Sequence, residues 1–466
     1  MQKHLLYLFI LVLAGCSQEK KKSPNVFFAG EIVNPTSNQV FLYKGNVILD
    51  SAKLNENNRF TFKLPSVEEG LHHFEHGEGL KRELQYVFFE KGDSIQIRLN
   101  TIDFDESLVF SGEGAEINNF LLDLFLVNEE EEKLILSTYF KMEPEEFNKR
   151  IEELRSEKLK SLDQLISETG LSVAEKKIAE VTINYTFFNY KEKYPFEHRK
   201  KTGKKTLHAL PEGFYAYRNN VSFNSKDLNY FKPYYDFMKS HLNNLSYMGC
   251  AEKCGVENEK ITNHLHFNRH KLTLIDSLVE ESELKDNLFR NVAFDYLLMA
   301  QDTESNNEIF IQDFHLRSAN NRHIQEISDL YEGIRNIQPR KKIPNVLVTD
   351  VDGNKISLQE IAKDKKVVFY FWTGANKRYF KDIHKRVNQL SSAKKEYTFV
   401  GINHNTDDTT WKGMIEQTQL NPSNQYKAVN FEELTRALVI YPPNKCIITE
   451  DAKIVDAFTT MWASNF

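Results

Sequence analysis

Residues 343–380 read IPNVLVTDVDGNKISLQEIAKDKKVVFYFWTGANKRYF and decide the fold of the C-terminal part of the chain. The segment opens with a short apolar strand, turns at Asp352-Gly353 and continues into a short helical pattern. The uninterrupted apolar run from Val367 to Phe371 predicts a buried strand, because strands covered on both faces are apolar throughout. Further strands are predicted at 397–402 and 446–448. Strands that alternate with helices predict an α/β domain with a partly parallel sheet over residues 343–466.

This C-terminal region resembles the TlpA-like branch of the thioredoxin superfamily. The resemblance rests on residues spread over nearly the whole module: Pro344, Asp352-Gly353, Leu358, Phe371-Trp372, Asp407, Trp411, Pro443, and Asp451 followed by Lys453-Ile454-Val455. It implies a thioredoxin-like fold. It also implies that the functional site lies where the strand ending in Phe371-Trp372 leads into a helix.

The sulfur atoms that this family uses for catalysis are missing from the sequence. In the family a Cys-x-x-Cys motif starts the helix, whose N-terminus lowers the pKa of the first thiol so that its thiolate attacks a disulfide. Carried onto this sequence, the two cysteines fall on Asn376 and Tyr379. A Thr-x-x-Cys peroxidase motif starting at Thr373 also ends on Asn376. We therefore expect a redox-inactive domain with no catalytic residue, no cofactor and no metal.

Pro443 matches the position of the family's cis-proline, which helps to hold an extended partner strand beside the active site. Here the proline is doubled as Pro442-Pro443. A surviving groove beside Pro443 would hold a peptide or protein segment without cleaving it. A purely structural turn is the alternative. The chain also leaves little room for a closing helix after the last predicted strand, so one sheet face is either less covered or covered by the preceding region.

The first sixteen residues, MQKHLLYLFILVLAGC, carry the signs of a secretion signal. Lys3 supplies a positive charge, and the apolar run that follows is too short to span a bilayer. The segment 13–16, LAGC, resembles a bacterial lipobox, which implies cleavage after residue 15 and a palmitate-type lipid anchor on Cys16. Residues 16–24 then form a tether. A serine directly after the cysteine, here Ser17, resembles the pattern of Gram-negative lipoproteins that are sent to the outer membrane. A buried N-terminal helix is the alternative.

Two further regions lie between the tether and the thioredoxin-like domain. Residues 25–112 contain short β-branched and aromatic runs separated by turn residues, which predicts an antiparallel β-sandwich-like domain. This region resembles the β-domain that precedes thioredoxin modules in envelope lipoproteins, through the phrases LDSA (49–52), NRFTF (58–62), EKGDS (90–94) and FSG (110–112). Residues 113–340 show apolar side chains at spacings of three and four, which predicts a helical region. The expected fold class is therefore multidomain α+β.

Composition excludes several function classes. The chain has 466 residues and a formal net charge of −6, whereas nucleic-acid-binding domains are usually basic. No run after the signal segment approaches 18 apolar residues, so no transmembrane helix is expected. The expected partners are the membrane, through the lipid anchor, and a protein or peptide of the cell envelope, with no nucleic acid.

The three remaining cysteines have separate predicted roles. Cys250 and Cys254 are close enough to form a disulfide in an oxidising compartment, provided that the chain turns between them, and free thiols are the alternative. With His266 and His270 they also come near a zinc-finger spacing, a weaker hypothesis. Cys446 lies in a predicted buried strand and is expected to be a core residue.

A second group of titratable residues, His72, His73 and His76, lies on a predicted strand. Alternation sends His72 and His73 to opposite faces, so we expect solvated surface rather than a metal site. The sequence as a whole predicts a membrane-anchored lipoprotein with a binding or scaffolding role. The alternative is a thiol-disulfide oxidoreductase, or an accessory of envelope redox homeostasis, that uses Cys250 and Cys254.

Overall fold

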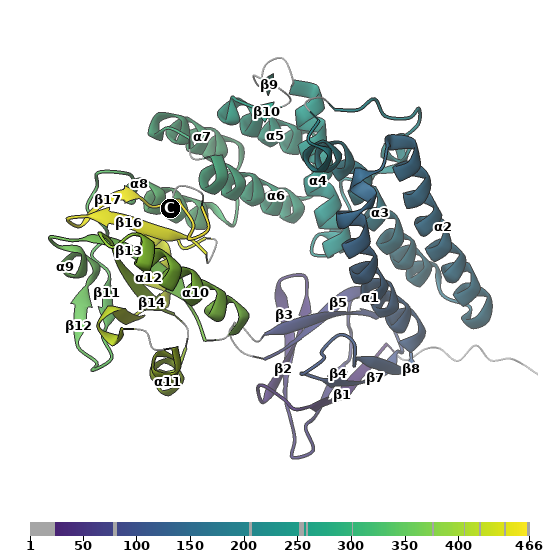
Figure 1. Ribbon diagram of the computed structural model, residues 1–466. Helices are drawn as coiled ribbons and strands as arrows, with labels where there is room; N and C mark the ends of the chain where they lie inside the picture. The colour runs from purple at the N-terminus through teal and green to yellow at the C-terminus, as the bar shows by residue number, and fades with distance from the viewer. Residues whose placement is uncertain are drawn as a thin grey trace, which may run out of the picture.

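The computed structural model contains a β-domain, a helical region and a C-terminal α/β domain (Figure 1). It describes residues 24–77, 82–204, 207–250, 256–257, 260–300, 302–374, 377–404, 406–418, 421–441 and 444–463. Cys16, Cys254, Asn376 and Pro443 lie outside these ranges. Among the helices that the structure describes, none is long and apolar enough to cross a membrane.

The β-domain consists of two four-stranded sheets packed face to face. One sheet has the order β4-β1-β7-β8 and the other β3-β2-β5-β6. Alternating side chains fill the space between the sheets, as Phe60 and Phe62 do on one strand, because successive residues of a strand point to opposite faces. The strands are β1 (Val26–Val33), β2 (Gln39–Lys44), β3 (Val47–Lys53), β4 (Arg59–Leu64), β5 (Gly70–His76), β6 (Glu83–Phe89), β7 (Ser94–Asn100) and β8 (Val109–Glu113).

The expectation of a purely antiparallel domain was wrong at one pair of strands. β1 and β7 run parallel, with Phe28 beside Ile95 and Ile32 beside Leu99. Between β1 and β7 the chain forms β4 of the same sheet and all four strands of the other sheet, and it then returns beside β1 in the same direction. A parallel pair needs such a long crossover, and strand patterns alone do not show which strands become neighbours.

His72 and His76 of β5 are buried and His73 is half-buried, so the expectation of a solvated surface was also wrong. β5 is an inner strand between β2 and β6, and both of its faces pack against protein. His72 is bonded to the Gly70 carbonyl and lies against the Phe89 ring. His76 accepts from the Thr36 amide and contacts the Gln39 carbonyl, so both of its ring nitrogens have partners.

The helical region begins directly after β8 and is built from long antiparallel helices. Ser172 and Glu175 form a capping box that starts α3, as each side chain bonds the other residue's backbone amide. Gly170 ends the preceding helix in the left-handed conformation, with a φ of 70°. The helices are α1 (Ala115–Ser137), α2 (Pro144–Thr169), α3 (Val173–Thr202), α4 (Lys232–Cys250), α5 (His264–Leu278), α6 (Ser282–Asp295), α7 (Glu304–Arg317) and α8 (Ile324–Asn336). Two short strands, β9 (Val256–Glu257) and β10 (Lys260–Ile261), follow α4.

The C-terminal domain is a seven-stranded mixed sheet with the order β12-β11-β15-β14-β13-β16-β17. Its centre is parallel: β13 pairs with β14, and β14 with β15. Its elements are β11 (Leu347–Thr349), β12 (Lys355–Ser357), α9 (Leu358–Ala362), β13 (Lys366–Trp372), α10 (Lys377–Ala393), β14 (Thr398–Asn403), α11 (Asp408–Thr418), β15 (Gln425–Ala428), α12 (Phe431–Leu438), β16 (Cys446–Glu450) and β17 (Lys453–Asp456). Between β17 and Ala463 the chain forms no further helix.

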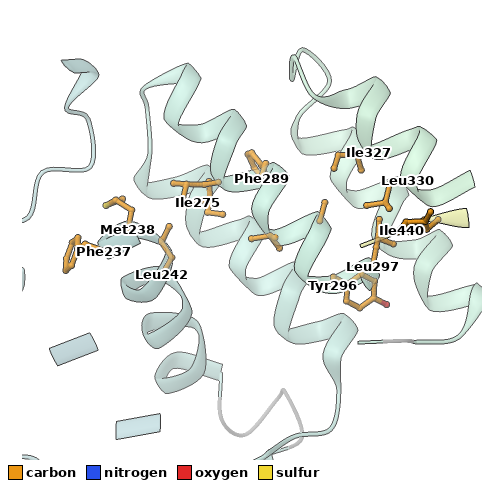
Figure 2. Packing of buried hydrophobic residues seen from close by; sticks show 14 of the residues in the cluster. Phe237, Met238, Leu242, Ile275, Phe289, Tyr296, Leu297, Ile327, Leu330 and Ile440 are labelled. Carbon is orange, nitrogen blue, oxygen red and sulfur yellow. The ribbon is translucent and has the colours of Figure 1, made fainter. Parts of the chain in front are cut away.

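The two faces of this sheet belong to different cores. Val368, Tyr370 and Trp372 face α10 and α11, while Phe369 and Phe371 point to the other side and join the large core of the helical region. Figure 2 shows side chains of that core running from α4 through α5 and α6 to α8 and to Ile440. The helical region therefore packs against the face of the sheet that carries Phe369 and Phe371.

Gly333→Ala is expected to weaken the contact between α8 and α12. A Cβ at Gly333 would lie 2.7 Å from the carbonyl oxygen of Arg436, which is backbone and cannot move aside cheaply. Overpacking of this kind costs about 1–3 kcal/mol, which urea unfolding would measure. Gly413→Ala is the matched control, because Gly413 is also helical and has open space around it. The prediction is wrong if both variants are more stable than the wild type, as expected when alanine replaces glycine in a helix without steric conflict.

Candidate functional site

The candidate site lies where β13 ends and α10 begins. Of the two positions onto which the sequence resemblance predicts the family's cysteines to fall, Asn376 is outside the described residues and Tyr379 lies in the first turn of α10. The Tyr379 hydroxyl donates to the Phe371 carbonyl at 3.1 Å, and its ring packs near Trp462. Burial raises the pKa of Tyr379, and the neighbouring Cys446 and Tyr370 raise it further. This position therefore holds a protonated, hydrogen-bonded phenol.

Cys446 is a buried sulfur close to this site. It stands on β16 opposite Tyr370 of β13, its side chain is fully buried, and it is a free cysteine. Burial raises the pKa of the Cys446 thiol, and the negative charge of Asp456 adds to the effect. Because the thiolate is the reactive form, this thiol is an inert part of the core, as the sequence indicates.

A buried polar network holds the strands beneath the site. Gln425 accepts from the Trp372 indole at 3.2 Å and donates to the Tyr370 hydroxyl at 3.0 Å. Gly401 makes room for it, since a Cβ there would come within 2.3 Å of the Gln425 amide oxygen. Each polar atom that these three side chains bury finds a partner, which rigidifies the core. Sequence analysis missed this network, because a lone Gln at the start of a strand gives no signal.

His384 on α10 lies under the aromatic residues of the site. Its ring is close to Trp372 and Phe380, at centroid distances of 5.1 and 4.4 Å. Nδ1 is bonded to the Phe380 carbonyl, whereas Nε2 is buried and has no hydrogen-bond partner. Burial lowers the pKa of His384 to about 4, so the ring is neutral at physiological pH.

The loops after β13 and β14 are tied together by Thr406. Its hydroxyl accepts from the Gly374 amide at 2.8 Å and from the Asn403 side chain at 3.1 Å. Asp407 then accepts from the Thr410 amide and starts α11, whose Trp411 is buried. These contacts explain why an Asp and a Trp four residues apart follow β14: one caps the helix and the other anchors it to the core.

Lys445, two residues after the proline pair, is bonded to the end of α12. The Lys445 ammonium is buried and donates to the carbonyls of Leu438 and Val439, both at 2.8 Å. These carbonyls end α12, where the helix dipole favours a cation. Burial lowers the pKa of Lys445 to about 7. Pro443 itself lies outside the described residues, so its role remains a prediction.

The cysteine at the end of α4 is disulfide-bonded. Cys250 takes part in a disulfide, and its sulfur lies 3.3 Å from Nδ1 of His266. Cys254, the partner predicted from the sequence, is outside the described residues. His270 is bonded to the Ser246 hydroxyl at 3.1 Å. A zinc site needs cysteine as a thiolate, so the zinc hypothesis for this Cys/His set is not supported.

A comparison with protein families finds one match, in the C-terminal part of the chain. A model described as the AhpC/TSA family matches residues 339–439. The match supports a thioredoxin-superfamily domain in this segment. No curated protein matches the chain.

Several solved structures resemble about a quarter of the chain. One is the thioredoxin domain of a thiol-disulfide oxidoreductase from Bacteroides vulgatus, with 22% identity, a TM-score of 0.22, and 25% of this chain and 86% of that chain covered. Another is a thiol:disulfide interchange protein from Bacteroides sp., with 21% identity, a TM-score of 0.22, and coverage of 26% and 80%.

Proposed function

We propose that the protein is a lipid-anchored lipoprotein of the bacterial cell envelope whose thioredoxin-like domain binds a protein or peptide and does not catalyse thiol-disulfide exchange. The observation that carries this proposal is Tyr379. It stands where a resolving cysteine would stand, and its hydroxyl is held by the Phe371 carbonyl. The sequence supports it further, because Asn376 takes the place of the attacking cysteine and a carboxamide forms no thiolate.

Insulin-disulfide reduction tests the absence of redox catalysis. The full-length protein is expected to reduce insulin no faster than dithiothreitol alone, since neither motif position carries sulfur. Cys446→Ser is the matched control, because it removes the buried free thiol without touching the motif positions. Reduction that depends on Tyr379 would contradict the proposal.

Site-specific crosslinking tests the binding role. A photo-crosslinking amino acid at Tyr441, which is 45% exposed next to the proline pair, is expected to capture an envelope protein in living cells. The same group at Ile102, which is 72% exposed on the β-domain, serves as the control. Equal capture at both positions, or none at Tyr441, would argue against a binding groove beside Pro443.

The lipid anchor is tested separately. Cys16→Ser is expected to release the protein from the membrane fraction and to abolish labelling with radioactive palmitate, because the thioether that carries the lipid cannot form. Two or more acyl chains hold a protein firmly on a bilayer. Membrane association that survives the substitution would exclude Cys16 as the anchor, and separation of the two membranes would test the outer-membrane assignment.

A second candidate function is thiol-disulfide exchange by Cys250. The observation that favours it is the His266 imidazole 3.3 Å from the Cys250 sulfur, because a histidine beside a sulfur can act as a general acid or base when the disulfide opens. Cys254→Ser would trap a mixed disulfide with a substrate if this pair is catalytic. A fully oxidised Cys250 in the native protein, and no trapped partner, would leave a structural bridge.

A further inference from the structure

Three potential metal ligands from separate segments meet at the edge of the helical region. Glu143 precedes the first residue of α2, His198 lies near the end of α3, and His208 follows α3 in a loop. One ligand atom of each residue lies within 4.8 Å of the others. No other such group of three is found among the described residues.

The His198 ring is buried and oriented as a metal-binding histidine would be. Its side chain is 1% exposed. Nδ1 lies 3.0 Å from the Phe140 carbonyl, which only an N–H can satisfy, so the free lone pair of the neutral ring is on Nε2. That atom is buried and has no hydrogen-bond partner. A metal-binding histidine usually donates its other nitrogen to a carbonyl in this way, which fixes the ring and its tautomer.

Glu143 and His208 complete the group on the solvent side. One Glu143 carboxylate oxygen lies 3.1 Å from His208 Nδ1, and the other lies 3.1 Å from the Lys204 ammonium. Lys204 thereby holds the carboxylate in place while leaving one oxygen toward the histidines. The His208 ring stands edge-on to that of His198, with centroids 4.6 Å apart. A surface ion pair would explain Glu143 and His208 alone, but it leaves the buried Nε2 of His198 without a partner.

We propose that Glu143, His198 and His208 bind a zinc ion. Two imidazole nitrogens and one carboxylate oxygen are a ligand set that zinc accepts, at bond lengths of about 2.0–2.2 Å, so small side-chain movements would bring the three atoms onto one ion. Three protein ligands leave a fourth tetrahedral position for water. Exposure of Glu143 on that side lets solvent reach it.

A zinc ion at this position would connect three segments that the backbone hydrogen bonds leave separate. The start of α2, the end of α3 and the following loop would share one centre. The metal would satisfy the Nε2 atom of His198, whose burial without a partner otherwise costs free energy. The consequence is a helical region that is more stable with zinc than without it.

Zinc binding to the purified full-length protein tests the site. Isothermal titration and elemental analysis are expected to show one zinc ion for each chain, and cobalt substitution should give the visible absorption of a tetrahedral site. His208→Gln and Glu143→Gln are expected to weaken binding at least 10-fold. Both residues have solvent-accessible side chains, so these variants should fold, and circular dichroism would check that they do.

His323→Gln provides the matched control. His323 also faces a glutamate, Glu326, and its side chain is 23% exposed, as is that of His208. This variant should bind zinc with wild-type affinity. The proposal is overturned if the wild type binds no stoichiometric zinc, or if zinc binding survives in both site variants. It is equally overturned if binding is lost with His266→Gln and retained with His208→Gln, which would place the ion beside Cys250.

Discussion

Glu192→Ala is expected to destabilise the protein by about 3–5 kcal/mol, because it leaves the Arg218 guanidinium without its counterion and several buried polar side chains without a hydrogen-bond acceptor. The Glu192 carboxylate is fully buried. It accepts hydrogen bonds from Arg218 at 2.5 and 2.9 Å, from His241 at 2.7 Å, and from Tyr217 and Asn244, each at 2.8 Å. These residues come from α3, α4 and the segment between them, so one carboxylate holds three parts of the helical region.

Urea unfolding followed by circular dichroism would measure this loss of stability. Glu326→Ala is the matched control, because Glu326 also binds an arginine through both oxygens but lies at the surface. Exposed ion pairs contribute about 0–1 kcal/mol, so the two variants should differ several-fold. A Glu192→Ala variant that unfolds at the same urea concentration as the control would refute the prediction.

Acidification from pH 7 to pH 5 is expected to lower the free energy of unfolding by about 5 kcal/mol in total through three buried histidines. Burial lowers the pKa of His72, His384 and His404 to about 4, and each has one ring nitrogen without a partner. In the unfolded chain these rings take up a proton near pH 6.5. The unfolded state therefore binds more protons than the native state below that pH, and stability falls as the pH drops from 6.5 towards 4.

His384→Phe isolates one third of this effect. An aromatic ring of similar size fits between Trp372 and Phe380, and it cannot be protonated. The variant is expected to lose about 2 kcal/mol less than the wild type between pH 7 and pH 5. His264→Phe is the control, because His264 is exposed and stays in water on folding. Equal pH dependence in the wild type and both variants would show that His384 does not contribute.

Local patterns were sufficient to predict most elements of the fold. The alternation at Phe60 and Phe62 indicates a strand with one buried face, and the structure confirms it. The run from Val367 to Phe371 indicates a strand covered on both faces, and each of its side chains is buried. Both features depend only on near neighbours in the sequence, which explains the success.

Features that depend on distant residues were missed. The parallel pairing of β1 with β7 follows from a crossover of about sixty residues, and the burial of His72 follows from the neighbours of β5. The local sequence shows neither that β7 pairs with β1 nor that β5 lies between two other strands. The polar centre at Glu192 was missed for the same reason, since its partners lie 25 to 52 positions away.

The candidate site was predicted in part. The resemblance predicted a site between β13 and α10 and assigned Tyr379 to a position that carries sulfur in the family. The bond from Tyr379 to the Phe371 carbonyl and the Gln425 network required coordinates. Glu143 and His198 are 55 positions apart and became a candidate pair of ligands only once the helices were placed.

The continuous core of the helical region and the C-terminal sheet changes the meaning of the boundary near residue 341. Family resemblance marks that point as the start of a separable module, but Phe369 and Phe371 complete their packing against residues that precede it. The family resemblance begins at this boundary, but the hydrophobic core continues across it. A fragment that begins there would expose to water the part of the sheet face that packs against the helical region, so the thioredoxin-like domain depends on that region to bury its apolar side chains.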